Sequence, residues 1–598
     1  MESVLVCRIA LLFCIVAALS IPVQAQSPAQ SYGTISGKVM SDDGPVPFAA
    51  VTVSATGARD RNNGMRNLTS DAEGNFKAEG LRAAAYIVTA SSPGYVAESA
   101  SLLPSEGLAN QTDPPAPTYY RIGDTATIRL IKGGVITGRV LNQMGDPMIG
   151  IRVTAQLVIN VQPQRTFAGA GSGETQTDDR GVYRIYGLGA GNYLVSANPT
   201  SGPGGQFASQ FGAQFPGRPL NPYAGNAPVY HPSGSRGMAS EVMVNCGVES
   251  GGIDIQYRPI KGSSISGVVA GSDPGFTVVT LTDKPSGQVV NTAFVAPRGG
   301  QARRGPADGQ QGFSIQGVAD GEYELSAQGG SPEDSFSAAP VKVTVSGADV
   351  TGLVLNLKPM AAIRASVQIE TPIKCNATRP ASLDEQVFSL RPINQPSPPN
   401  QPTSVPNPSG AISFGSLSAG KYQLGAVMLD ERYFIRSIAA PVKTPARNTA
   451  AAQKNPPAMF ELSRNGITLK AGEKLTDIVV AVSEGAASID GQVVKAGGTQ
   501  VTETWRVHLV PADRELADEV LRYSETSSGV GGNFKFRNIA PGKYLLLAVP
   551  ATSGDSQAAF HPTDPAARLR LRRAAETANQ PIELQPCGKV GNIQIRSN

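Results

Sequence analysis

The amino-acid sequence predicts an all-β protein of five tandem Greek-key β-sandwich domains that follow a signal peptide. Three observations lead to this prediction: one pattern of residues recurs five times, the apolar residues of each copy alternate, and turn-forming residues are abundant. The 598 residues include 66 glycines and 46 prolines, and only 16% of the residues are charged. This composition is typical of short strands joined by tight turns rather than of helical bundles.

The best-kept part of each copy ends in a tyrosine. An aliphatic residue stands five positions before it, and an aromatic residue, or isoleucine in the fourth copy, stands ten positions before it. After the tyrosine, an aliphatic residue and an alanine follow at a spacing of two, so the three side chains lie on one face of a strand. With the strand before it, this segment forms a hairpin element. The tyrosines are Tyr86, Tyr193, Tyr323, Tyr422 and Tyr544.

Each copy also has a first strand and a closing strand. The first strand reads Ile-x-Gly-x-Val, with Ala365 in place of glycine in the fourth copy, and the closing strand is a second alternating segment after the tyrosine. The first strands are expected at 35–39, 136–140, 265–269, 363–367 and 489–493, and the closing strands at 126–130, 253–257, 353–357, 478–482 and 593–595.

Two further features complete the expected unit. Segment 47–53 of the first copy matches 147–153 of the second, which predicts a middle strand that begins at a proline. Five residues before the first aromatic stands a residue that caps turns with its own side chain, or glycine in the last copy. A calcium loop at this turn would need a denser run of oxygen ligands than the sequence provides. The turn residues are Asp71, Asp178, Asp308, Asn407 and Gly529.

About seven short strands per copy favour two antiparallel sheets packed face to face. Each copy is long enough for a core of its own, because domains of about 100–150 residues are the commonest size. The joins are short, which predicts a semi-rigid string of sandwiches. The expected domains are 31–132, 133–260 with a long loop rich in Gly, Gln and aromatic residues, 261–360, 361–484 and 485–598. We refer to them as units 1 to 5.

Residues 1–25 have the features of a signal peptide. Arg8 precedes an apolar run at 9–19, and Ala25 ends a segment suited to cleavage. No later run reaches the roughly 20 apolar residues of a transmembrane helix. We therefore expect an exported protein without a transmembrane segment, cleaved near Ala25, and leave open whether it resides in the periplasm, at the cell surface or in the medium.

Three cysteines remain after such cleavage: Cys246, Cys375 and Cys587. An odd count leaves at least one thiol outside any intramolecular disulfide, and one cysteine per large domain is no disulfide framework. Cys246 and Cys587 stand at similar places before a closing strand, where we expect small buried apolar residues. The pairing of the three stays open.

The Gly-x-aromatic turn, the aliphatic residue five positions on, the Gly-x-Tyr that follows and the Ile-x-Gly-x-Val strand together resemble the carboxypeptidase regulatory-like domain, a family related to transthyretin-like and Cna B-type-like sandwiches. The resemblance covers all five copies, most strongly the first, second and fifth. It implies a seven-stranded, immunoglobulin-like Greek-key sandwich that accompanies catalytic, adhesive or receptor modules and is itself not catalytic. The isopeptide bond of some relatives would use Lys38, but the other copies lack this lysine.

Catalysis is not expected. The chain has 3 histidines, no His-Glu-x-x-His zinc motif and no Gly-x-Ser-x-Gly elbow. We expect no catalytic residue, no metal site and no cofactor, and the net charge of +4 over such a long chain indicates no nucleic-acid partner. The preferred function is an exported spacer, adhesion or binding scaffold at the cell envelope. The alternatives are a carbohydrate-binding protein with a related starch-binding-like sandwich and an accessory module of an envelope hydrolase or receptor system.

Two groups of residues are candidates for contacts with partners, which could be envelope polysaccharide or another envelope protein. The aromatic residues in the long loop of unit 2 could bind a ligand such as a sugar, whereas Trp505 lies in an alternating segment and is expected in the core. Four arginines in a predicted helix of unit 5 could contact an acidic surface, although the pattern favours a solvated helix face. The candidates are Phe207, Phe211, Phe215 and Tyr223 in the loop, and Arg568, Arg570, Arg572 and Arg573 in the helix.

Overall fold

A computed structural model of the chain confirms the all-β class. No helix among the residues described is long and apolar enough to cross a membrane. The structure describes residues 32–57, 65–98, 118–158, 173–198, 225–271, 276–285, 287, 289–295, 311–331, 334–376, 382–393, 401–441, 459–495, 501, 503–551 and 563–596.

In every unit the first strand lies between the strand of the recurring aromatic and the closing strand. It runs antiparallel to the former and parallel to the latter. The first strands are β1 (Tyr32–Ser41), β9 (Gly134–Leu141), β20 (Ser263–Gly271), β28 (Ala361–Glu370) and β37 (Ala487–Val494). The aromatic strands are β5 (Asn75–Arg82), β12 (Val182–Leu188), β23 (Gln311–Val318), β31 (Ala411–Leu417) and β40 (Asn533–Ile539). The closing strands are β8 (Thr125–Lys132), β17 and β18 (Glu249–Ser250, Ile255–Gln256), β27 (Val350–Pro359), β36 (Lys474–Glu484) and β43 (Lys589–Arg596).

A second group of strands in every unit is centred on an antiparallel pair between the middle strand and the tyrosine strand. A further strand pairs with the outer side of each middle strand. The middle strands are β3 (Ala50–Ala55), β10 (Arg152–Leu157), β21 (Thr277–Asp283), β29 (Gln386–Pro392) and β38 (Trp505–Pro511). The tyrosine strands are β6 (Tyr86–Ser91), β13 (Gly191–Asn198), β24 (Gly321–Gly330), β32 (Gly420–Met428) and β41 (Gly542–Pro550). The outer strands are β4 (Met65–Thr69), β11 (Gly173–Gln176), β22 (Val289–Val295), β30 (Thr403–Ser404) and β39 (Ser524–Ser527).

Shorter strands extend these sheets, and in unit 3 a single eight-stranded sheet contains both groups because β25 pairs with β24 and with β27. The remaining strands are β2 (Gly44–Pro45), β7 (Tyr95–Ala97), β14 (Asn226–Ala227), β15 (Val229–Tyr230), β16 (Val242–Val244), β19 (Ile260–Lys261), β25 (Ser335–Ala338), β26 (Val341–Val345), β33 (Tyr433–Pro441), β34 (Met459–Glu461), β35 (Ile467–Leu469) and β42 (Pro581–Leu584). The helices are η2 (Arg236–Met238), η3 (Leu383–Glu385), η4 (Arg514–Leu516), η5 (Val520–Arg522), η6 (Val530–Gly532) and α4 (Pro565–Ala578).

The buried apolar side chains form five large clusters, and the fully buried members of each come from one unit. The recurring isoleucine, valine and tyrosine are among them in every unit, for example Ile136, Val140 and Tyr193 in unit 2. Burial of such side chains stabilises a fold by about 1.5–3 kcal/mol each. The alternation seen in the sequence is therefore the inward face of both sheets.

The recurring tyrosine has a second role that alternation does not reveal. In all five units its hydroxyl donates a hydrogen bond to the carbonyl oxygen four residues earlier, over 2.7–2.9 Å. This bond ties the tyrosine strand to the loop that precedes it, as the tyrosine corner of other β-sandwiches does. The repeat therefore keeps tyrosine rather than phenylalanine at this position.

The glycine of the Ile-x-Gly-x-Val strand marks a close approach of the backbone. Opposite it, the register with the closing strand shifts in units 3, 4 and 5, as at a β-bulge. A Cβ on Gly491 would lie 2.8 Å from the carbonyl oxygen of Ile593 and against the ring of Phe534. The bulge therefore requires a residue with little or no side chain.

In units 1, 2 and 4 the turn residue before the aromatic strand caps its own turn, as expected, while Asp308 of unit 3 lies outside the described residues. The Oδ1 atom of Asp178 accepts hydrogen bonds from the backbone N–H groups of Arg180 and Val182, at 3.0 and 2.7 Å. Asp71 and Asn407 accept the equivalent pairs of bonds in units 1 and 4. These bonds explain the turn residue without a bound ion.

The alignment of segments 47–53 and 147–153 is wrong by two residues. Val51 lies opposite Ala90, and Val153 lies opposite Ala197, so these two valines are equivalent. A buried hydroxyl sets this register, because Ser70 accepts from the N–H of Ala49 and Thr177 from that of Ile151. Pro47 lies in a turn and Pro147 forms an isolated bridge with Leu141, and neither defines the start of the middle strand.

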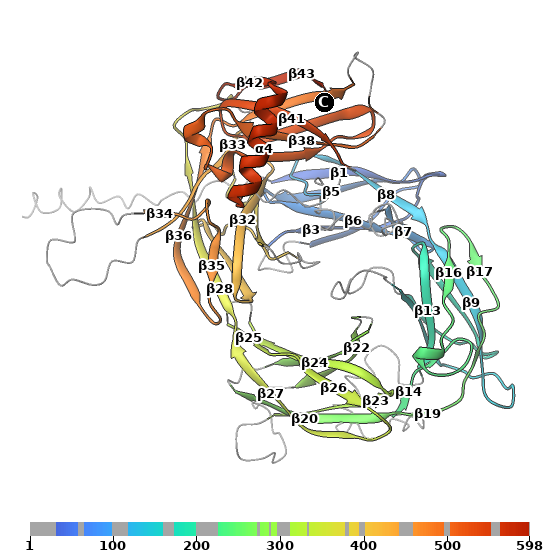
Figure 1. Cartoon of the computed structure of the whole chain (residues 1–598). Helices are drawn as coiled ribbons and strands as arrows, with labels where there is room; N and C mark the ends of the chain where they lie inside the picture. Colours follow the sequence, from blue (N-terminus) through green and yellow to red (C-terminus); the bar gives the residue numbers. More distant parts are fainter. Residues whose placement is uncertain are drawn as a thin grey trace, which may run out of the picture.

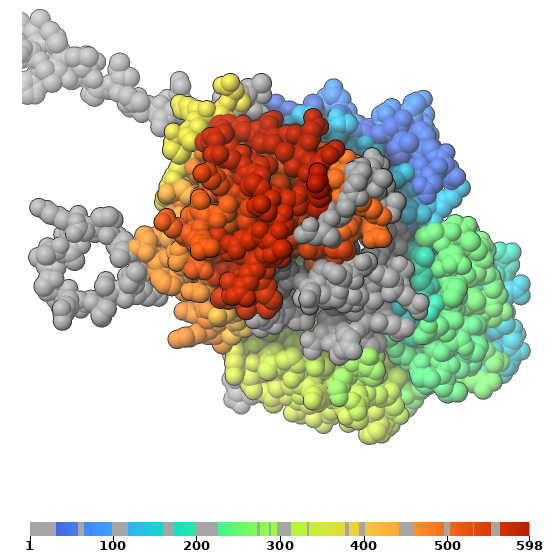
Figure 2. Space-filling model, turned by 45° about the horizontal axis from the view of Figure 1, so that its top comes forward, coloured from blue at the N-terminus to red at the C-terminus, as the bar shows by residue number. Residues whose placement is uncertain are grey.

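The units form a ring rather than the expected string (Figure 1). The chain runs from unit 1 (blue) through units 2, 3 and 4 to unit 5 (red), and unit 1 comes back against unit 4. The backbone N–H of Ala85 in unit 1 donates to the carbonyl oxygen of Asp384 in unit 4, over 2.9 Å. Unit 5 lies beside both unit 4 and unit 1 (Figure 2). Short joins restrict the freedom of each unit but do not set the direction of the chain, so they could not predict this contact.

Candidate functional site

The aromatic candidates Phe207, Phe211, Phe215 and Tyr223 lie outside the described residues. Trp505 is in the core of unit 5, as expected, with 6% of its surface exposed. It therefore offers no platform for a sugar ring.

The four candidate arginines do not share one face of α4. Arg568 and Arg572 are buried, at 6% and 7% exposure, while Arg570 and Arg573 are exposed. Arg568 pairs with Asp518 at 3.1 Å, and Arg572 donates to the carbonyl oxygen of Ala512 at 2.7 Å. These two side chains hold the helix against its own sheet and are not available to a partner.

Cys375 and Cys587 form a disulfide that joins unit 4 to unit 5. We expected a small buried apolar residue at Cys587 and left its pairing open; the structure pairs it with Cys375. The apparent match of Cys587 to Cys246 was also misleading. In the two equivalent turns, Cys587, with a backbone φ of 59°, takes the place of Gly247, with φ of 73°, and not the place of Cys246. Cys246 is a free thiol.

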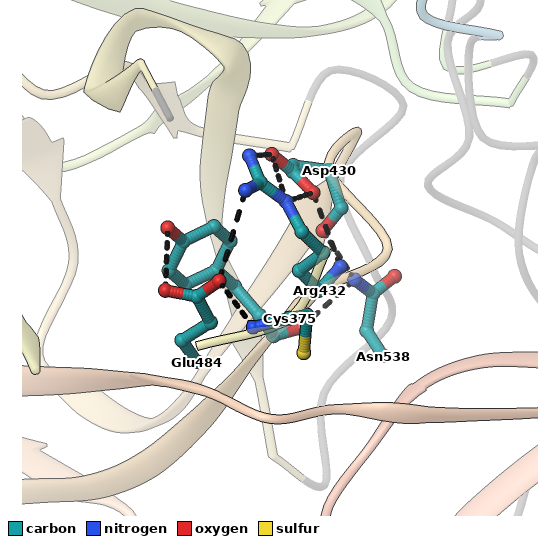
Figure 3. A network of polar contacts seen from close by, with 6 residues as sticks. Cys375, Asp430, Arg432, Glu484 and Asn538 are labelled. Carbon is teal, nitrogen blue, oxygen red and sulfur yellow. Dashed lines mark hydrogen bonds and ion pairs between the residues drawn. The ribbon is translucent and has the colours of Figure 1, made fainter. Parts of the chain in front are cut away.

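The disulfide borders the best-defined polar site in the described part of the chain, which is centred on the turn between β32 and β33 (Figure 3). Arg432 lies in this turn, and its guanidinium faces the carboxylate of Asp430, with Nε 2.9 Å from Oδ1. Its Nη1 atom is 3.7 Å from Oε1 of Glu484, the last residue of β36. Asp430 and Glu484 are both buried, so one guanidinium group lies between two buried carboxyl groups. We call Asp430, Arg432, Glu484, Asn538 and the disulfide the clamp.

Unit 5 completes the clamp through Asn538. Its side-chain amide donates to the carbonyl oxygens of Asp430 and Tyr433, at 2.8 and 2.9 Å. The residue has a left-handed backbone with φ of 59°, which asparagine tolerates better than most residues. Beside it, Arg537 pairs with Glu431 of unit 4 at 3.0 Å.

Backbone bonds hold the join between the two units in place. The N–H groups of Gly485 and Ala486 both donate to the carbonyl oxygen of Arg432, at 2.9 Å each. Gly485 in turn accepts from the N–H of Cys587, and Glu484 accepts from that of Cys375 at 3.0 Å. The same few residues therefore bind the turn, the join and both cysteines.

The electrostatics of the clamp favour its charged form. Burial alone would raise the pKa of Asp430, but hydrogen bonds from Arg432 and its positive charge outweigh burial and lower the pKa. The bond to Asp430 raises the pKa of Arg432. Burial, together with the nearby charge of Glu484, raises the pKa of the Tyr433 hydroxyl to about 12. These shifts fit a structural ion network, and none of them prepares a group to exchange protons near neutral pH.

The repeat did not predict the clamp. Asp430 and Arg432 lie in a loop outside the repeat, where charged residues are normally solvated, and Cys375 and Cys587 are 212 residues apart. The Asp-Glu-Arg run in a short connection between two apolar strands is the signal that could have identified it. No group of three or more metal-ligating side chains occurs among the residues that the structure describes.

Comparisons with known proteins identify one family. Residues 34–112 match the model of the carboxypeptidase regulatory-like domain. No curated protein matches the chain.

Several solved structures resemble the chain over long stretches at low identity. The Bacillus anthracis TIE protein is 10% identical and has a TM-score of 0.14, with 77% of this chain and 76% of that chain covered. A streptococcal ancillary pilin is 11% identical, with a TM-score of 0.16 and coverage of 55% and 99%. The minor pilin of Streptococcus agalactiae is 13% identical, with a TM-score of 0.16 and coverage of 41% and 99%. Scores this low carry no argument, so the family match is the informative finding: residues 34–112, within the first unit, are similar to the carboxypeptidase regulatory-like domain.

Proposed function

We propose that the chain is an exported, non-catalytic scaffold whose β-sandwich units hold binding or adhesive loops in fixed relative positions at the cell envelope. The observation that carries this proposal is the clamp, because a covalent bond and a buried ion network fix one unit against the next. Independent modules on a flexible tether would not need such a joint.

The other joints support a scaffold of fixed shape. At the joint of units 1 and 2, the N–H of Gly133 donates to the carbonyl oxygen of Gly94 at 2.8 Å. At the joint of units 2 and 3, β14 pairs with β19, and Arg236 lies 3.9 Å from Asp283. Contacts of this kind restrict the swing of one unit on the next.

The disulfide supports export. Disulfides persist in oxidising compartments and are rare in the cytosol of most organisms. A bond between two large units, 212 residues apart in sequence, is a lasting part of the architecture only where thiols are not kept reduced. The expected signal peptide at residues 1–25 is consistent with this location.

Carbohydrate binding is the second candidate, and one exposed ring favours it. Phe48 is 70% exposed and has a left-handed backbone, with φ of 53°, where unit 2 has Gly150 with φ of 69°. A bulky residue in such a conformation is strained, and strain of this kind gathers at functional sites. The ring could stack on a sugar face or on an apolar partner. A third role, as accessory module of an envelope hydrolase or receptor, would use the same surface.

Two experiments test these roles. Fractionation of cells that make the tagged full chain should place it outside the cytoplasm with Cys375 and Cys587 oxidised, whereas a reduced cytoplasmic product would contradict the scaffold proposal. Glycan arrays should then be probed with the full chain, with Phe48→Gly and with a deletion of 201–226. Binding lost in either variant would support carbohydrate recognition at that place. Equal binding of all three proteins would mean that neither Phe48 nor segment 201–226 recognises the glycan.

The exposed pair Arg570 and Arg573 stays a proposed contact with an acidic surface. Sedimentation with vesicles that contain anionic lipid should be compared for the full chain and for Arg570→Gln/Arg573→Gln, a double variant that leaves the buried arginines intact. Equal sedimentation of both would remove this surface from consideration.

A further inference from the structure

We propose that Phe48 of unit 1 and Phe276 of unit 3 form two equivalent binding sites for a neutral polysaccharide. The proposal rests on carbohydrate binding, the second candidate function above. It adds to that candidate a second site, a class of sugar and a number of bound ligands per chain, and it needs no contribution from segment 201–226.

The two phenylalanines occupy the same place in their units. Each stands three residues before the valine of the middle strand that lies opposite the alanine of the tyrosine strand, Val51 in unit 1 and Val279 in unit 3. Both rings are exposed, Phe48 to 70% and Phe276 to 43%. A single exposed ring is ordinary on a protein surface. Two exposed rings at one equivalent place indicate a shared role.

Each ring is held at the edge of its sheet. Phe48 has a left-handed backbone with φ of 53°, and its N–H donates to the carbonyl oxygen of Asp71 over 3.4 Å. The ring of Phe276 lies against that of Phe294, with 5.7 Å between the ring centroids and 38° between the ring planes. The carbonyl oxygen of Phe276 accepts from the N–H of Gly330. An aromatic surface fixed in this way loses little conformational entropy when a ligand binds.

Uncharged polar side chains follow each ring along the outward face of the sheet. Four residues after each phenylalanine, a threonine of the middle strand stands in a row with its neighbours on the outer strand and the tyrosine strand. The rows are Asn67, Thr52 and Thr89 in unit 1, and Thr292, Thr280 and Ser326 in unit 3. Hydroxyl and amide groups both donate and accept hydrogen bonds, as sugar hydroxyls do. Neither row contains a charged side chain, so a neutral sugar fits better than an acidic one.

The spacing of ring and row sets the size of the ligand. Four residues of extended strand span up to about 13 Å. A ligand that stacks on the ring and reaches the polar row must therefore be an oligosaccharide or a longer chain, because a monosaccharide is too short.

The other three units use the same place differently. Unit 2 has Gly150 there, and the ion pair of Arg152 with Glu174 lies on its outward face. Unit 4 has Glu385, which is only 1% exposed. In unit 5 the helix α4 packs on this face. The combination of an exposed ring with a neutral polar row is therefore a feature of units 1 and 3.

The two faces are turned toward the middle of the ring of units. Figure 1 shows the sheet of β3 and β6 on the side of unit 1 that points toward unit 3, and β22 and β24 on the side of unit 3 that points toward unit 1. A polysaccharide chain that reaches both sites would be bound twice, and the second contact would be intramolecular. Bivalent binding of this kind raises the affinity for a polymer above that for a short oligosaccharide.

The test is isothermal titration of the purified full chain with maltohexaose, cellohexaose and xylohexaose, and with the acidic hexasaccharide of galacturonic acid. We expect two molecules of one neutral hexasaccharide per chain, one in Phe48→Gly, one in Phe276→Leu and none in the double variant. The affinity for the matching polymer should fall at least about tenfold in each single variant, because bivalent binding is lost. The acidic hexasaccharide should bind more weakly than the neutral one.

The variants are chosen so that a loss of binding is not a loss of folding. Phe48→Gly suits the left-handed backbone, and Phe276→Leu keeps an apolar side chain beside Phe294. Thr280→Val removes one hydroxyl at nearly constant size and should weaken the site in unit 3 alone. The matched control is Tyr186→Ala, which removes a ring that is 53% exposed in unit 2 and should bind as the parent chain does.

Two bound hexasaccharides in the double variant would overturn the proposal and leave carbohydrate binding to another surface. No binding of any neutral hexasaccharide by the parent chain would overturn the proposal together with the carbohydrate-binding candidate. Tighter binding of the acidic sugar would overturn the assigned ligand class. The scaffold function is tested separately, by the fractionation of cells.

Discussion

The joint of units 3 and 4 and the joint of units 4 and 5 have the same backbone plan but very different contacts. In both, a closing strand leads almost directly into the next first strand, through Met360 in one case and through Gly485 and Ala486 in the other. In the described part of the earlier joint, the N–H of Met360 donates to the carbonyl oxygen of Ser335, and Lys474 forms an exposed ion pair with Asp334. The later joint adds the disulfide and a half-buried arginine that faces two buried carboxylates. The length of the join therefore does not determine how firmly two units are held. The contacts made by the neighbouring loops determine it.

The largest expected effect follows from Arg432→Ala. This change leaves the buried carboxylates of Asp430 and Glu484 without their shared cation, and breaking a buried ion pair typically costs about 3–5 kcal/mol. Denaturant unfolding followed in units 4 and 5 should show this loss. The matched control is Arg436→Ala, which removes an exposed pair with Glu370 in the same unit. Similar losses for both variants would mean that the clamp is no stronger than a surface pair.

Acid should weaken the later joint through Asp430. The folded-state pKa of Asp430 is below its ordinary value, so its contribution to stability is complete above the unfolded value of about 3.9 and is lost as the pH falls through the folded value. The midpoint of thermal unfolding should fall accordingly between pH 5 and strong acid. Asp430→Asn should flatten this dependence. A variant with the same pH profile as the parent chain would assign the acid sensitivity to other groups.

Asn538→Gly should have an intermediate effect. Glycine keeps the left-handed backbone but removes the amide that serves two carbonyl oxygens, and a buried acceptor left unpaired costs about 1–3 kcal/mol. Asn592→Gly is the control, because Asn592 has the same φ of 59° and an exposed side chain. The free energies of unfolding of the two variants, measured by chemical denaturation, should separate the effect of the lost hydrogen bonds from the effect of the change in backbone. Equal stability of the Asn538→Gly and Asn592→Gly variants would show that Asn538 contributes through its backbone conformation and not through its side-chain amide.

Lys474→Ala, at the earlier joint, should have the smallest effect. Both partners of its ion pair are more than half exposed, and such pairs contribute about 0–1 kcal/mol. The unfolding midpoint should therefore barely move, and added salt should remove the remaining difference from the parent chain. A loss as large as that of Arg432→Ala would remove the contrast between the two joints.

The parts of the fold that repeat could be predicted, because five copies of Ile-x-Gly-x-Val and of the tyrosine segment report the inward faces of strands. The features that the copies do not share could not be predicted. The ring depends on Ala85 meeting Asp384, and the clamp depends on Cys375, Arg432 and Cys587 converging from separate loops. Single side chains in loops have no period, and only the folded chain shows which of them meet. The two-residue error in the alignment of segment 47–53 has a similar cause. A proline that lies in a turn was taken for the start of a strand, whereas the buried Ser70 sets the register.

The parallel pairing of first and closing strands has a mechanical consequence. Each unit begins at the start of one strand and leaves at the end of its parallel neighbour, so the two ends of a unit point in opposite directions along the same pair. A pull on the chain loads all hydrogen bonds of this pair at once, in shear, instead of opening them one after another. The five units all have such a pair, and a disulfide bridges the last two units, so tension applied along the chain would be carried in shear at each unit.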